Sequence, residues 1–151
     1  MPRIETILVA TDGSPASAAA GDEAIELALR LGARLLVVNV VNVTEVTAGA
    51  SIFPGTLFGA RQEAEAIARA VVDDARKSGV SATYLTWEGQ PGEAIVAAAE
   101  SEDADLVVVG THGRSVIGRL FLGSVSEYVV RHSRVPVMVV RPQEVPSAAV
   151  R

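Results

Sequence analysis

The chain has 151 residues, no cysteine and a formal net charge of −5, which together suit one acidic globular domain. The absence of cysteine excludes disulfides and thiolate metal sites, and two histidines alone are too few for a typical zinc site. Hydrophobic residues make up 49% of the chain, which argues for a packed core and against disorder. The sequence shows neither a signal-peptide pattern nor an apolar run of membrane-spanning length, so we expect a cytoplasmic protein with neither nucleic acid nor membrane as partner.

Strand and helix signals alternate from the N-terminus onwards. Residues 7–10 form a short apolar run that ends in a polar turn. Ser14 followed by Pro15 is typical of a helix start, because a hydroxyl caps free N–H groups and the proline ring presets φ. Gly32 is placed to end this helix, and residues 35–41 are almost wholly apolar, as expected of a strand covered on both faces.

The same alternation continues to the C-terminus. We expect a helix over residues 60–77, a strand over 80–87, a short helix from Pro91, a strand over 106–109, a helix over 124–131 and a strand over 135–140. Repeated strand–helix–strand units with apolar strands predict right-handed crossovers onto a parallel sheet. The fold class is therefore α/β, a single doubly wound domain over residues 1–142 with a short tail over 143–151.

One segment, residues 42–59, interrupts this pattern. It contains three glycines and a proline together with the apolar residues Ile52, Phe53, Leu57 and Phe58. A loop of this length in a compact domain is usually a lid, a binding surface or partly disordered. Its apolar residues favour packing on a partner or a ligand.

Glycine spacing between the fourth strand and the fourth helix carries the main chemical signal. Gly110 and Gly113 are separated by two residues, and Gly123 follows nine residues later, directly before Ser124. Glycines let a backbone approach an anion closely and adopt positive φ, and a helix start offers free N–H groups with a positive dipole end. Residues 110–141 also carry five arginines against one glutamate, a local excess that suits a small anionic ligand.

Plainer explanations exist for the same residues, and spacing alone slightly favours them. Glycines after a strand often serve only to make a turn, and Ser124 with Glu127 forms a capping-box pattern. His112 fits an ordinary exposed turn, and Asp12 could cap the first helix. Neither the lysine-containing phosphate loop nor the Gly-x-Gly-x-x-Gly motif is present, which disfavours P-loop enzymes and dinucleotide-binding dehydrogenases.

The pattern Gly110-x-x-Gly113-(nine residues)-Gly123-Ser124 resembles the ATP-binding signature of the universal stress protein family. The similarity extends over residues 3–141 and includes segments 10–14, 88–91, 103–110 and 135–140. It implies a five-stranded sheet of order 3-2-1-4-5 with four helices and a ligand crevice between strands one and four. It further implies an adenine pocket of Ala10, Thr11, Val40 and Val109, Asp12 near the ribose and phosphates, and phosphate contacts from Gly110, His112, Gly113, Arg114, Gly123, Ser124, Val125 and Ser126.

The resemblance implies an ATP-binding regulatory protein of the stress response, with Mg²⁺ accompanying the nucleotide and a homodimer formed through the edge strand 135–140. The sequence shows no base that would orient water for phosphoryl transfer. We therefore expect no dedicated enzyme, and at most slow ATP hydrolysis or autophosphorylation at Ser115, Ser124 or Ser126. The alternative is a dimeric interaction module of the same fold that binds no nucleotide.

Overall fold

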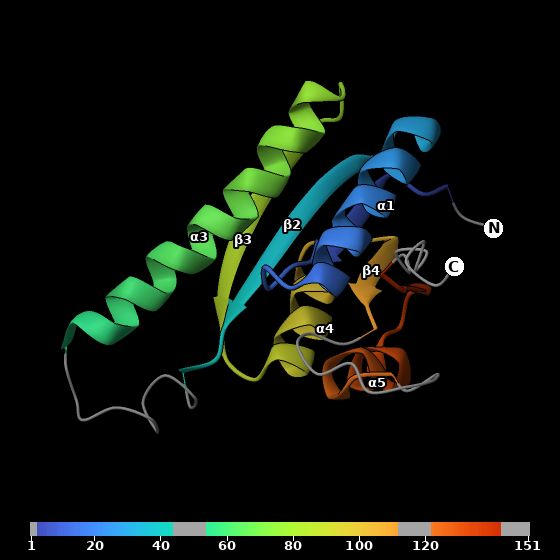
Figure 1. Cartoon of the computed structure of the whole chain (residues 1–151). Coiled ribbons are helices and arrows are strands. Elements are labelled where there is room, and N and C mark those ends of the chain that lie inside the picture. Colours follow the sequence, from blue (N-terminus) through green and yellow to red (C-terminus); the bar gives the residue numbers. More distant parts are fainter. Residues whose placement is uncertain (1–2, 44–53, 112–121, 143–151) are drawn as a thin grey trace, which may run out of the picture.

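The computed structural model describes residues 3–43, 54–111 and 122–142. Five parallel strands form one sheet in the order β3-β2-β1-β4-β5, and four helices in these ranges cover it (Figure 1), which confirms the predicted doubly wound α/β fold. The elements are β1 (Thr6–Ala10), α1 (Pro15–Leu31), β2 (Arg34–Val41), α3 (Pro54–Lys77), β3 (Ala82–Glu88), α4 (Pro91–Ser101), β4 (Leu106–Gly110), α5 (Ser124–His132) and β5 (Val137–Val140).

Helix α1 begins and ends where its sequence signals predict. The Ser14 hydroxyl accepts a hydrogen bond from the N–H of Ser17 at 3.2 Å, and Pro15 occupies the first helical position. Gly32 follows the helix in the left-handed conformation, with φ of 65°, and its N–H donates to the carbonyl of Ala28. The helix therefore leads directly back into β2.

Two apolar cores lie on opposite faces of the sheet. Successive residues of a strand point to opposite faces, so an apolar run such as Ile7, Leu8 and Val9 supplies both cores at once. The core under α1 and α3 is filled largely by valine, leucine, isoleucine and alanine. The core under α4 and α5 has the same character, which explains how a chain with 4% aromatic residues packs its interior.

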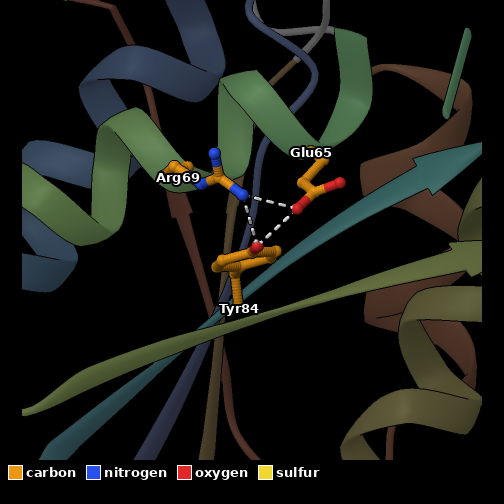
Figure 2. A network of polar contacts seen from close by, with 3 residues as sticks. All are labelled: Glu65, Arg69 and Tyr84. Atoms are coloured by element: carbon orange, nitrogen blue, oxygen red, sulfur yellow. Dashed lines mark hydrogen bonds and ion pairs between the residues drawn. The ribbon is translucent and has the colours of Figure 1, made fainter. Parts of the chain in front are cut away.

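A polar network fastens the long helix α3 to the edge strand β3 (Figure 2). The Tyr84 hydroxyl on β3 donates to Glu65 Oε1 at 2.7 Å, and Arg69 Nη2 donates to both groups, at 3.1 Å and 2.6 Å respectively. Arg61 of α3 also pairs with Glu88 at the end of β3. These pairs are exposed, so each contributes modestly to stability and mainly sets where α3 lies.

Three predicted element starts differ from the structure by two residues or more. Helix α3 begins at Pro54, not at residue 60, so the last part of the expected loop is helical. Strand β3 begins at Ala82 because the N–H of Val80 still donates to Ala75 at the end of α3. Strand β5 begins at Val137 because Pro136 has no N–H to donate. The remainder of the expected loop, residues 44–53, and the tail over 143–151 lie outside the described residues.

Candidate functional site

A cavity of about 260 Å³ opens at the carboxyl ends of the strands, where the strand order reverses between β1 and β4. Doubly wound proteins bind their ligands at this switch point. Ten of the thirteen predicted site residues line it: Ala10, Thr11, Asp12, Val40, Val109, Gly110, Gly123, Ser124, Val125 and Ser126. The other three, His112, Gly113 and Arg114, lie outside the described residues.

The cavity is also lined by seven residues that were not predicted as site residues: Ser14, Ala16, Ser17, Val38, Pro91, Ile95 and Thr111. Pro91 and Ile95 belong to the first turns of α4, which starts at the same edge of the sheet. Their position could have been predicted, because a helix that follows a parallel strand begins at the carboxyl end of that strand, where the cavity lies. Tertiary packing decides which of these helices contribute side chains to the cavity, and no local sequence pattern reveals that packing.

One end of the cavity is an aliphatic slot. Strand β1 ends at Ala10, opposite Val38, whereas β2 continues past Val40. Val109 of β4 lies on the other side of β1, and Ile95 of α4 packs in the same core. Only aliphatic side chains form these walls, so this part of the cavity suits an uncharged, apolar group.

The turn after β1 holds Asp12 in place. Asp12 Oδ1 accepts the N–H of Ser14 at 2.8 Å, and the N–H of Asp12 donates to Ser17 Oγ at 3.2 Å. The N-cap of α1 is Ser14 itself, so the alternative that Asp12 caps this helix is wrong. The backbone bond that holds the turn therefore engages Oδ1 of this carboxylate.

The carboxyl group of Asp12 is ionised at neutral pH. Partial burial, the largest single influence, raises the pKa of this group, but hydrogen bonds from Ser14 and then Ser17 together outweigh burial and lower it below its usual value. The site therefore presents one negative charge at the mouth of the aliphatic slot. That charge suits hydroxyl donors or a cation and repels a bare anion.

The opposite end of the cavity is the open N-terminus of α5. Its N-cap is Gly123, with φ of −66° and ψ of 164°, and no side chain caps the helix. The alternative that Ser124 and Glu127 form a capping box is therefore wrong, because Ser124 is already the first helical residue. The first intrahelical bond runs from the N–H of Glu127 to the carbonyl of Gly123 at 2.9 Å. The N–H groups of residues 124–126 are thus left for a ligand, with the positive end of the helix dipole behind them.

A single carbonyl ties this helix to the end of β4. The carbonyl oxygen of Thr111 accepts both the N–H of Gly123 and the hydroxyl of Ser126, the latter at 2.6 Å. Ser126 is only 2% exposed, and its hydroxyl also lies 3.0 Å from the carbonyl of Gly123. In this arrangement the Ser126 hydroxyl is engaged with backbone carbonyls, so the phosphate contact expected of Ser126 stays a prediction for its N–H group.

Gly110 shapes the floor of the cavity through packing. A Cβ at this position would lie 2.6 Å from the backbone carbon and oxygen of Ala16 in the first turn of α1. The φ of Gly110 is not positive, so the expected left-handed conformation is not the reason for glycine here. Close approach of two backbones is the reason.

Metal-binding side chains are sparse in the part of the chain that the structure describes. No group of three or more histidine, aspartate or glutamate side chains gathers there in a way that could hold a metal ion. Within the same ranges, no helix has the length and apolar character needed to cross a membrane.

The fold and the cavity define a doubly wound α/β protein with its crevice at the switch point. Residues 3–141 match the model of the universal stress protein family, and the chain belongs to that family, as the glycine spacing predicted. A universal stress protein of Thermus aquaticus is 39% identical over 140 residues, which cover 91% of this chain and 98% of the relative.

Solved structures of universal stress proteins share the fold. One from Burkholderia pseudomallei is 33% identical, with a TM-score of 0.71 over 95% of this chain and 99% of its own. Another, solved in complex with cAMP, is 30% identical, with a TM-score of 0.65 over 94% of this chain and 100% of its own.

Proposed function

We propose that this chain binds ATP in the cavity between β1 and β4 and acts as a dimeric regulatory protein of the stress response. The observation that carries the proposal is the pairing of an aliphatic slot with an uncapped helix N-terminus in one cavity. The slot accepts the flat adenine ring, and the N-terminus of α5 accepts phosphate. A relative with the same fold was solved with cAMP, another adenine nucleotide, which supports the choice of base.

The phosphate end of the proposed site uses backbone groups more than side chains. The N–H groups of residues 124–126 and the exposed hydroxyl of Ser124 are the donors that the structure makes available. His112, Gly113 and Arg114 complete this end in the proposal on the strength of the glycine spacing alone.

Asp12 serves the ribose or the cation that accompanies ATP. Its carboxylate is ionised, and one of its oxygens is not needed to hold the turn. A carboxylate oxygen accepts hydrogen bonds from ribose hydroxyls and is also a ligand that Mg²⁺ prefers. Because Asp12 is the sole carboxylate among the described lining residues, Mg²⁺ in the proposal is held mainly by the phosphates.

Hydrolysis is at most slow in this proposal. Phosphoryl transfer needs a group that positions and deprotonates the nucleophile, and the described lining offers only Asp12 for that role. If autophosphorylation occurs, Ser124 is a better acceptor than Ser126, because Ser124 is exposed and the Ser126 hydroxyl is buried and bonded. The cytoplasmic location expected from the sequence stays a prediction.

Strand β5 supports the proposed homodimer. It lies at the edge of the sheet, and all four of its residues, Val137–Val140, are only half-buried although they are apolar. An unpaired apolar edge invites pairing with another chain. The same strand would also serve the alternative function, a dimeric module without nucleotide, so binding and association must be measured separately.

Filling the slot tests where the base binds. Ala10→Leu extends a side chain into the slot and should abolish ATP binding, whereas Ala18→Leu, on the exposed face of α1, should not. Trp87, the single tryptophan, lies opposite Val40 in the β2–β3 ladder and reports on the slot by fluorescence. A saturable ATP response that Ala10→Leu leaves intact would place the base elsewhere.

A further inference from the structure

One buried hydroxyl beside the cavity has no partner. Thr111 is 6% exposed, and its Oγ1 makes no hydrogen bond, although the carbonyl of the same residue accepts two. Burying a hydroxyl without a partner is unfavourable, because the group gives up its hydrogen bonds to water and gains none in return. A buried polar group without a partner in a native structure therefore needs an explanation, such as a ligand that accepts its hydrogen bond.

The direction of this side chain follows from the sheet. The N–H of Thr111 donates to the carbonyl of Val140 at 3.0 Å, so the β4–β5 ladder continues to this residue. Side chains alternate along the ladder, which places Thr111 on the same face as Val109, under α4 and α5. Both residues line the cavity, and the unpartnered Thr111 hydroxyl is buried beside it.

The other unpartnered atom serves as a contrast. Among the described residues, Asn39 Nδ2 is also buried without a hydrogen bond, but Asn39 does not line the cavity. It alternates with Val38 and so points to the opposite face, beneath α1 and α3. Only Thr111 combines an unsatisfied hydroxyl with a place at the open end of α5.

We propose that the Thr111 hydroxyl donates a hydrogen bond to the phosphoryl group of the bound nucleotide and so selects phosphorylated over unphosphorylated ligands. The open end of α5 offers further donors, because the N–H groups of residues 124–126 have no partner within the helix. The carbonyl of Thr111 is already occupied by Gly123 and Ser126. A ligand group that satisfies several donors at once is an acceptor with several oxygens, which describes a phosphoryl group and not the base. This inference rests on the proposed function.

The test compares AMP with adenosine in calorimetric titrations of the full chain. Thr111→Val removes the hydroxyl and keeps the shape, so AMP should bind about tenfold more weakly while adenosine is unaffected. The unfolding midpoint of the ligand-free variant should be no lower than that of wild type, because no hydrogen bond is lost. Thr111→Ser should retain the preference for AMP.

Thr6→Val is the matched control. Thr6 is equally buried, but its hydroxyl accepts from Arg34 Nε at 2.9 Å at the far end of β1, so this change should lower stability and leave AMP affinity unchanged. If Thr111→Val does not fold, Thr111→Ala carries the same prediction for AMP against adenosine. Wild-type affinity for AMP in these variants, or an equal loss for adenosine, would overturn the inference. A wild-type chain that binds neither ligand would instead reject the proposed function.

Discussion

At Gly110 the end of β4 lies against the first turn of α1, with no room for a side chain. We predict that Gly110→Ala lowers the free energy of unfolding by about 1–3 kcal/mol, because backbone atoms must move apart to admit the methyl group. Gly59→Ala is the control, since its Cβ would meet nothing in α3 and alanine favours helix. Urea denaturation measures both, and a Gly110→Ala variant as stable as wild type would contradict the packing argument.

The pKa of the Asp12 carboxyl is lowered in the folded chain, and the direction of this shift can be tested. Folding favours the ionised carboxylate, so its contribution is fully present above the pKa of the unfolded chain and is lost as pH falls through the lower folded value. Asp12→Asn keeps an acceptor for the N–H of Ser14 but removes the charge. We expect wild type to exceed the variant in stability by a constant amount near neutral pH, and the difference to shrink below about pH 4.

Chemical denaturation at a series of pH values gives this difference directly. A difference that grows on acidification would mean that folding raises the pKa of Asp12 and that burial outweighs its hydrogen bonds.

At the scale of the element, a hydrogen bond from Ser126 ties the first turn of α5 to the residue after β4. Ser126→Ala removes the tether to the carbonyl of Thr111. We predict a loss of about 1 kcal/mol in unfolding free energy together with weaker AMP binding. Ser124→Ala should leave stability unchanged, because the exposed Ser124 hydroxyl makes no hydrogen bond in the described structure. Equal unfolding midpoints for Ser126→Ala and wild type would show that the tether is dispensable.

How well the sequence predicted each element depended on whether its signals were local. Helix α1 was predicted at both ends because Ser14, Pro15 and Gly32 act on their immediate neighbours. Pro54, the first residue of α3, was interpreted as part of a loop because Gly55 and Gly59 follow it, although proline is common at a helix start. The capping box of α5 was wrong because the helix already includes Ser124. The N–H of Gly123 bonds the carbonyl of Thr111 after β4, so a contact distant in the sequence sets where α5 starts.

The site residues at the ends of the strands could be predicted from the sequence, but those that depend on helix packing could not. Ala10, Val40 and Val109 follow from the strand order and the position of the switch point. The wall formed by Ile95 of α4 and the unpartnered hydroxyl of Thr111 depend on which groups end up within reach after packing. Gly110 was selected for the wrong physical reason, because close contact with α1 is invisible in a linear pattern.

At the scale of the whole molecule, the parallel sheet brings the carboxyl ends of its strands together around the cavity. The same strand order leaves β5 at the side of the sheet, with only one neighbouring strand in the described part of the chain. We predict a homodimer in solution and expect Val139→Lys to shift it toward monomer, because a charge at a half-buried edge position opposes strand pairing.

Sedimentation velocity at micromolar concentration measures this association. Leu29→Lys is the control, since Leu29 is 53% exposed on α1 and lies beside the C-terminal end of α3. A wild-type monomer would remove the dimer from the proposal, and equal effects of the two lysines would show that association does not depend on the β5 edge.

Direct binding of ATP to the purified full chain tests the central claim most simply. Isothermal titration calorimetry with ATP and Mg²⁺ should give saturable binding with one nucleotide per chain, because the proposal places one nucleotide in the cavity between β1 and β4. Absence of saturable binding even at millimolar ATP would contradict the account and favour the interaction module without nucleotide.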